Sequence, residues 1–112
     1  MGKGDFLGEF EQVVLLAVLR QEQQGYGMSI RREIEECVGR EVTIGAVYAT
    51  LGRLERKGLL RSHEGAATPV RGGRARRHFR VTKGGADALR ASRNMMDRLW
   101  HGVDLGRDGR TA

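Results

Sequence analysis

The stretch that decides the fold reads Thr43-Ile44-Gly45-Ala46-Val47-Tyr48-Ala49-Thr50-Leu51-Gly52-Arg53-Leu54-Glu55. Its large aliphatic residues Ile44, Val47, Leu51 and Leu54 are spaced three, four and three residues apart, as on one face of an amphipathic helix. A threonine hydroxyl can cap the start of such a helix, and a glycine can end it. The sequence therefore predicts a helix that is capped by Thr43 and stopped by Gly58, with an apolar face directed at a core.

The opposite face of this helix is small at its beginning and cationic at its end. It consists of Gly45, Ala46, Ala49, Thr50, Gly52, Arg53, Arg56 and Lys57. Each interior glycine costs about 1 kcal/mol relative to alanine, so helix propensity does not explain these residues. Two interpretations remain open, a backbone that approaches a surface such as the major groove of DNA and a loosely optimised solvent-exposed face.

Two further helices are predicted upstream. Apolar residues at helical spacing run from Phe10 to Val18, and Leu15, Leu16 and Leu19 widen this face until the segment 8–20 is apolar nearly all round. A helix buried on every side in so small a protein needs a second chain to cover it, which indicates an oligomer. A second helix runs from about Met28 to Gly39, in which we expect Cys37 to be a small buried hydrophobe rather than a regulatory thiol.

Downstream of Gly58 the pattern changes to that of a hairpin followed by a last helix. Residues 59–64 and 76–82 are predicted strands, with Phe79 and Val81 on one face of the second. The segment between them is rich in glycine and is flanked by arginines at positions 71, 74, 76 and 77, which indicates a nucleic-acid contact or, alternatively, a solvated loop. Thr82 can cap a final helix whose narrow apolar seam is typical of a coiled coil. The seam comprises Leu89, Met96, Leu99 and Val103, with Ser92 in its gap.

The positive charge of the chain is concentrated in one block. The 112 residues include 20 Lys or Arg and 14 Asp or Glu, for a net charge of +6. Residues 53–83 alone hold ten basic and two acidic residues, a balance of +8. A local basic field of this kind indicates a polyanionic partner.

Three helices, a basic hairpin and a fourth helix in this order describe a mainly α fold with a small β-hairpin, the winged helix-turn-helix. We expect this DNA-binding domain to span residues 7–83, a dimerisation helix to span residues 84–105, and a flexible tail to follow at 106–112. In such a domain the third helix enters the major groove of double-stranded DNA, and the hairpin contacts phosphates or the minor groove.

Several motifs also resemble the PadR family of bacterial transcriptional regulators, in the subgroup with a single C-terminal dimerisation helix. They are Leu7-Gly8-Glu9-Phe10-Glu11, Tyr26-Gly27, the stretch from Gly45 to Glu55, Lys57-Gly58-Leu59-Leu60, the stretch from Arg71 to Phe79, and Val81-Thr82-Lys83-Gly84-Gly85. The chain departs from the family pattern at Ala46, where Thr is frequent, at Ala75, where Pro is common, and at His78-Phe79, which replaces a Tyr pair. The resemblance implies a homodimeric repressor that binds a palindromic operator and is released by a small effector.

The residues expected to contact DNA are Thr43, Gly45, Ala46, Tyr48, Ala49, Thr50, Arg53, Arg74, Arg76 and Arg77. For Tyr48 a hydrogen bond to phosphate and a half-buried place beside the core are equally compatible with the sequence. The residues expected to form the dimer surface, or a groove for a small apolar or aromatic effector, are Leu15, Leu16, Leu89, Met96, Leu99, Trp100 and Val103.

Other classes of protein are disfavoured by the sequence. No nucleophile–base pair, phosphate loop or set of metal ligands stands out, so neither an enzyme nor a cofactor is expected. The longest apolar run, Val13 to Leu19, is too short to span a bilayer, and a single cysteine suits a reducing cytoplasm. The alternative hypothesis is an interaction module whose basic hairpin binds an acidic protein.

Overall fold

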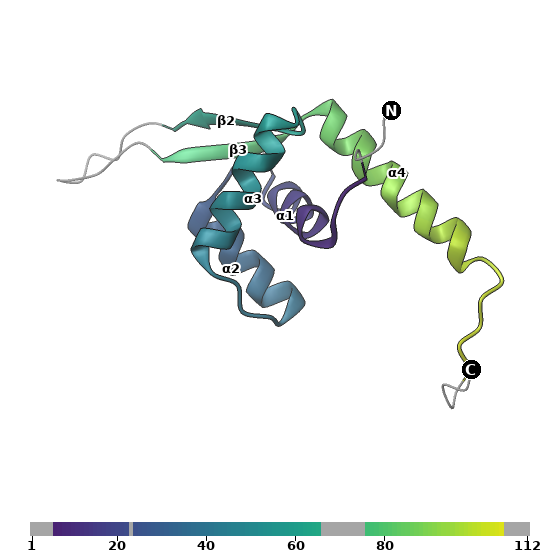
Figure 1. Cartoon of the computed structure of the whole chain (residues 1–112). Helices are drawn as coiled ribbons and strands as arrows, with labels where there is room; N and C mark the ends of the chain where they lie inside the picture. The colour runs from purple at the N-terminus through teal and green to yellow at the C-terminus, as the bar shows by residue number, and fades with distance from the viewer. Residues whose placement is uncertain (1–5, 23, 66–75, 107–112) are drawn as a thin grey trace.

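The computed structural model describes residues 6–22, 24–65 and 76–106, and within them it contains four helices and three short strands. The elements follow one another as α1 (Glu9–Arg20), β1 (Gly25–Tyr26), α2 (Gly27–Val38), α3 (Ile44–Arg56), β2 (Leu60–Glu64), β3 (Arg77–Val81) and α4 (Lys83–Trp100). Helices α1, α2 and α3 pack together, the β2–β3 hairpin projects from one side, and α4 leaves on the other (Figure 1). This arrangement confirms the predicted winged helix-turn-helix fold.

The predicted starts of α3 and α4 and the predicted ends of α2 and α3 are confirmed by their capping groups, whereas α4 ends at Trp100 and not at residue 105 as expected. The Thr43 hydroxyl accepts a hydrogen bond from the Ala46 backbone N–H at 3.0 Å, and the Thr82 hydroxyl accepts one from Gly85 at 3.1 Å. Gly39 and Gly58 follow α2 and α3 with φ values of +73° and +78°, a left-handed conformation that glycine adopts without steric cost.

The sheet is antiparallel with the strand order β1-β3-β2. Leu60 pairs with Val81 and Ser62 with Phe79, so that Leu60, Phe79 and Val81 are buried on one face. Strand β1 was not predicted from the sequence. A strand of two residues has no periodicity to detect, and only its pairing of Gly25 with Phe79 defines it.

The hydrophobic core lies between α1, α2, α3 and the inner face of the sheet. Its fully buried side chains are Val14, Leu15, Val18, Ile30, Ile34, Val47, Leu51, Leu54, Leu60 and Phe79. The apolar residues of α1 are thus mostly covered by its own chain, and among them only Leu16 and Leu19 are exposed. Leu15 is completely buried in the core, which corrects its assignment to the dimer surface.

Cys37 is exposed rather than buried, which corrects a second expectation. Its thiol lies at the end of α2 and donates a hydrogen bond to Glu33 Oε2 at 3.2 Å. This hydrogen bond raises the pKa of the Cys37 thiol, so the reactive thiolate is disfavoured.

None of the described helices is both long enough and apolar enough to cross a membrane.

Candidate nucleic-acid interface

The outer face of α3 is open and is formed by small residues. Gly45, Ala46 and Ala49 are exposed, and a methyl group added at Gly45 would meet no atom within 4 Å. Thr43 is exposed beside them at the start of the helix. The backbone of the first two turns of α3 can therefore approach a flat or grooved partner closely.

Tyr48 lies at the edge of this face and is 49% exposed. Its ring covers the start of α2 so closely that a Cβ atom at Gly27 would overlap the phenol. The Tyr48 hydroxyl has no hydrogen-bond partner within the described ranges, and it is therefore available to a ligand at this surface.

Thr50 lies on the inner side of the helix, contrary to the expectation that it belongs to the exposed face. It is 3% exposed, and its hydroxyl accepts a hydrogen bond from Arg53 Nη2 at 3.4 Å. Its position follows from helical geometry, since Thr50 is three residues after Val47 and four before Leu54 on the buried side. Thr50 is therefore not accessible to DNA in this structure.

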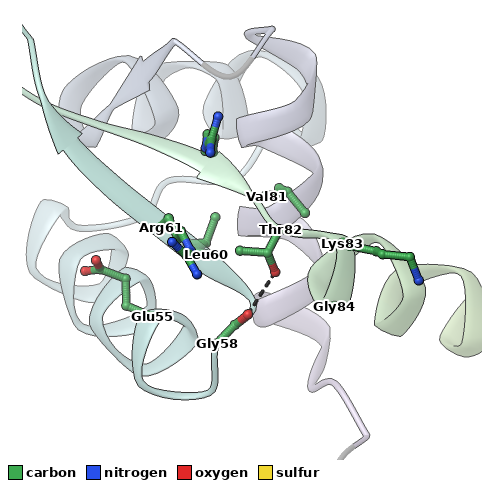
Figure 2. Close-up of a pocket in the computed structure, with 9 residues that line it drawn as sticks. Glu55, Gly58, Leu60, Arg61, Val81, Thr82, Lys83 and Gly84 are labelled. Atoms are coloured by element: carbon green, nitrogen blue, oxygen red, sulfur yellow. Dashed lines mark hydrogen bonds between the residues drawn. The ribbon is translucent and has the colours of Figure 1, made fainter.

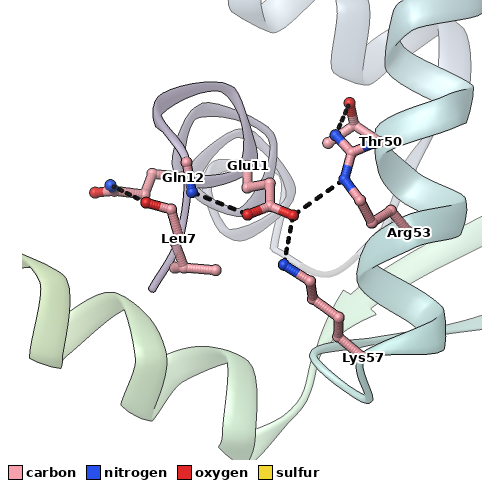
Figure 3. A network of polar contacts seen from close by, with 7 residues as sticks. Leu7, Glu11, Gln12, Thr50, Arg53 and Lys57 are labelled. Atoms are coloured by element: carbon pink, nitrogen blue, oxygen red, sulfur yellow. Dashed lines mark hydrogen bonds and ion pairs between the residues drawn. The ribbon is translucent and has the colours of Figure 1, made fainter. Parts of the chain in front are cut away.

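Arg53 and Lys57, at the end of α3, share one carboxylate on α1. Glu11 Oε2 accepts from Arg53 Nε at 3.1 Å and from Lys57 Nζ at 2.8 Å (Figure 3). Burial raises the pKa of Glu11, but hydrogen bonds from Lys57, the Gly8 backbone and Arg53 outweigh this effect, and the net result is a lowered pKa. The carboxylate is thus kept charged and ties α3 to α1.

The β2–β3 hairpin forms the wing of the fold, and the arginines beside it have different partners. Arg77 pairs with Glu55 at 3.2 Å and donates to the Ser62 hydroxyl at 3.1 Å, so its head points back toward α3. The Arg76 guanidinium is exposed and lies 4.4 Å from the centre of the Tyr26 ring. Arg74, also expected to contact DNA, lies outside the described residues, as does Arg71.

Two further arginines, Arg61 and Arg80, were missed by the sequence analysis. They stand directly opposite each other on β2 and β3, both are exposed, and neither has a carboxylate partner among the residues described. Like charges in this relation destabilise a hairpin, so the pair favours an anion nearby. Together with Lys83 and with Glu55 of α3, they line a hollow of about 680 Å³ between the hairpin, the end of α3 and the start of α4 (Figure 2). The strict alternation of the strands would have revealed the pair, had the register been known.

The Thr82 hydroxyl fixes one wall of this hollow. It donates to the Gly58 carbonyl at 2.8 Å while it accepts from Gly85, and so it joins the end of α3 to the start of α4.

A second groove lies between α1 and α4 and is mostly apolar, although Gln12, Arg90, Ser92, Arg93 and Asp97 also line it. Its volume is about 560 Å³, and its apolar lining includes Leu16, Leu19, Leu89, Met96 and Trp100. Leu99 and Val103 do not line it, but they are 65% and 50% exposed on the free end of α4 and beyond. With the exception of the buried Leu15, the residues expected at the dimer surface are thus exposed or half-buried around α4.

Within the described ranges, no group of three or more His, Cys, Asp or Glu side chains could hold a metal ion. His63 and His78 are cross-strand neighbours with ring centres 5.7 Å apart.

A helix with a small open face, next to a wing that carries exposed arginines, defines a winged-helix DNA-binding domain. Comparisons with known proteins agree with this class. The model of the "Transcriptional regulator PadR-like family" matches residues 15–91, which is more than half of the chain. The protein therefore belongs to the PadR-like family of transcriptional regulators.

Solved structures show the same fold. A PadR family transcriptional regulator from Eggerthella lenta is 23% identical, with a TM-score of 0.68 over 93% of this chain and 88% of that one. F93 from STIV, described as a winged-helix DNA-binding protein, is 14% identical, with a TM-score of 0.68 over 88% and 99% of the two chains. The hsRosR-S4 complex is 26% identical, with a TM-score of 0.59 over 93% and 80%. No curated protein sequence matches.

As a member of this family, the protein is a transcriptional regulator that binds DNA, and it is not an enzyme.

Proposed function

We propose that the protein is a homodimeric repressor that binds a palindromic operator and is released from it by a small apolar or aromatic effector. The observation that carries this proposal is the exposed apolar surface of α1 and α4. Leu16, Met96, Leu99 and Trp100 are each between 46% and 65% exposed, and they need a partner to leave water.

A second copy of the chain fits this surface because α4 extends away from the packed helices (Figure 1). Two such helices, each with a narrow apolar seam, can bury one another in an antiparallel or crossed pair. The two-fold symmetry of this dimer predicts two inverted half-sites, about 34 Å or one duplex turn apart.

We propose that the open face of α3 reads base edges and that the wing holds phosphates or the minor groove. The base-reading residues would be Thr43, Gly45, Ala46, Tyr48 and Ala49, and the wing residues Arg74, Arg76 and Arg77, to which we add Arg61 and Arg80. Arg77 would leave Glu55 to reach DNA. An effector would occupy the apolar groove between α1 and α4, where Trp100 and Met96 offer adaptable contacts.

The proposal is tested by selecting fragments of the source genome that the purified protein retains, followed by sedimentation of the complex. We expect a palindromic consensus bound by two chains, and a slope of log K against log salt near −7 if about eight phosphates are neutralised. A salt-independent affinity, or no preference for the palindrome over random duplex, would overturn the proposal. Tight, salt-dependent binding to an acidic protein instead would support an interaction module.

The division of roles is tested with two variants. Arg76→Ala should weaken binding to all duplexes alike, whereas Ala49→Gln should change the preferred bases. Equal losses on every sequence for both variants would contradict this division.

A further inference from the structure

We propose that Glu11 determines the specificity of DNA binding without touching DNA, by keeping Arg53 and Lys57 from acting as free cations toward phosphates. This inference rests on the proposed DNA contact of the α3 surface. It concerns a residue on α1, outside the recognition helix and the wing.

The contacts of Glu11 are made by both carboxylate oxygens. Oε1 accepts from the backbone N–H of Gly8 at 2.9 Å, and Oε2 accepts from Arg53 and Lys57 across 42 and 46 residues of sequence. The Glu11 side chain is 8% exposed, whereas those of Arg53 and Lys57 are 47% and 36% exposed. A buried anion thus holds two cations whose heads are still accessible to solvent (Figure 3).

Arg53 is held by two groups at once. Its Nε donates to Glu11, while its Nη2 donates to the Thr50 hydroxyl, and this fixes the plane of the guanidinium toward α1. By contrast, Arg56, which lies between Arg53 and Lys57, is exposed and has no carboxylate partner in the described part of the chain. Arg53 and Lys57 are therefore paired with a carboxylate whereas Arg56 is not, and Glu11 is the residue that causes this difference.

This arrangement bears on specificity because non-specific affinity for DNA increases with the number of cations that neutralise phosphates. Specificity is the ratio of operator affinity to this background. A carboxylate that neutralises two cations lowers the non-specific affinity for DNA, and it does not alter the face of α3 that is formed by small residues. Arg53 would then reach DNA only where a favourable contact replaces its bond to Glu11.

A purely structural tie between α1 and α3 would behave differently. Loss of such a tie would weaken binding to every duplex and would not make its salt dependence steeper. Loss of an electrostatic restraint would strengthen binding to random duplex and increase its salt dependence.

The experiment compares Glu11→Gln with Glu9→Gln. Glutamine at position 11 can still accept from Gly8, so the helix cap is retained. Glu9 is the matched control because it lies on the same helix, carries the same charge and pairs with Arg40 instead of with α3. Binding of each variant to a random-sequence duplex is measured by fluorescence anisotropy over a series of salt concentrations.

We expect the slope of log K against log salt to be more negative in Glu11→Gln than in Glu9→Gln by about 1 to 2 per chain, since each phosphate contact contributes about 0.9. In the Glu11→Gln background, Lys57→Ala should remove about half of this difference. Equal slopes for the two glutamine variants, or weaker binding of the random duplex by Glu11→Gln than by Glu9→Gln, would overturn the inference. If the wild-type protein itself bound duplex DNA without salt dependence, the proposed function would fail instead.

Discussion

Helices α3 and α4 begin in the same way but are covered very differently. Each follows a threonine whose hydroxyl caps the N–H three residues later. Along α3 the apolar residues Val47, Leu51 and Leu54 are buried in the chain's own core, whereas along the second half of α4 Leu99 and Trp100 stay exposed. The comparison shows that caps and periodicity specify a helix but do not specify what packs against its apolar face. For α3 this is the rest of the same chain, and for α4 we propose that it is a second chain.

The largest expected effect is on the free energy of unfolding, and it distinguishes the buried apolar face of α3 from the exposed apolar face of α4. Leu51→Ala should lower the free energy of unfolding by about 2–5 kcal/mol at any protein concentration, because it opens a cavity in the core. Leu99→Ala makes the same chemical change, but its effect should depend on protein concentration, because in the proposed dimer its contacts are between chains. Urea unfolding at two concentrations checks this, and concentration-independent losses for both variants would remove the distinction.

A charged residue on the exposed apolar face of α4 should prevent formation of the proposed dimer. Leu99→Asp should shift the protein from dimer to monomer in sedimentation velocity and lower operator affinity, since burying an unpaired carboxylate is unfavourable. Met28→Asp is a matched control, because Met28 is also exposed but lies on α2. A dimer that tolerates Leu99→Asp would place the interface on another surface.

The two capping threonines should differ in a smaller, measurable way. Thr43→Ala removes one accepted hydrogen bond and should cost about 1 kcal/mol. Thr82→Ala also removes the bond donated to the Gly58 carbonyl and should cost about 1 kcal/mol more. Chemical denaturation of the two variants side by side measures this difference, and equal losses would show that the Thr82–Gly58 bond adds nothing.

The smallest expected effect concerns pH and the attachment of α3 to α1. The lowered pKa of Glu11 means that its ion pairs stabilise the fold above the unfolded pKa of about 4.3, and that this stabilisation is lost as the pH falls through the folded pKa. The difference in unfolding free energy between wild type and Glu11→Gln should therefore shrink as the pH falls from 7 to about 3. A constant difference across this range would indicate that Glu11 acts through packing alone.

The predictable part of the molecule was local. Thr43, Gly39 and Gly58 mark helix ends because their effects act over three or four residues. The alternation around Phe79 likewise gave the buried face of β3. Strand β1 was not predictable, because two residues carry no pattern and only pairing with β3 defines them.

The errors at individual residues have a common cause. Leu15, Cys37 and Thr50 each lie at the border between the apolar and polar faces of a helix. A small rotation of the helix about its axis exchanges burial and exposure at such a border. Sequence periodicity gives the centre of an apolar face well and its edges poorly. Packing against neighbouring helices then decided that Leu15 and Thr50 are buried and Cys37 is exposed.

The sequence by itself determined the helices and hairpin, their order, the basic block and the resemblance to PadR regulators, because these depend on local spacing and composition. Only the tertiary structure brought Glu11 beside Arg53 and Lys57 and placed Arg61 opposite Arg80. Such contacts join residues far apart in the chain, and strand register and helix packing, which no local pattern encodes, decide them.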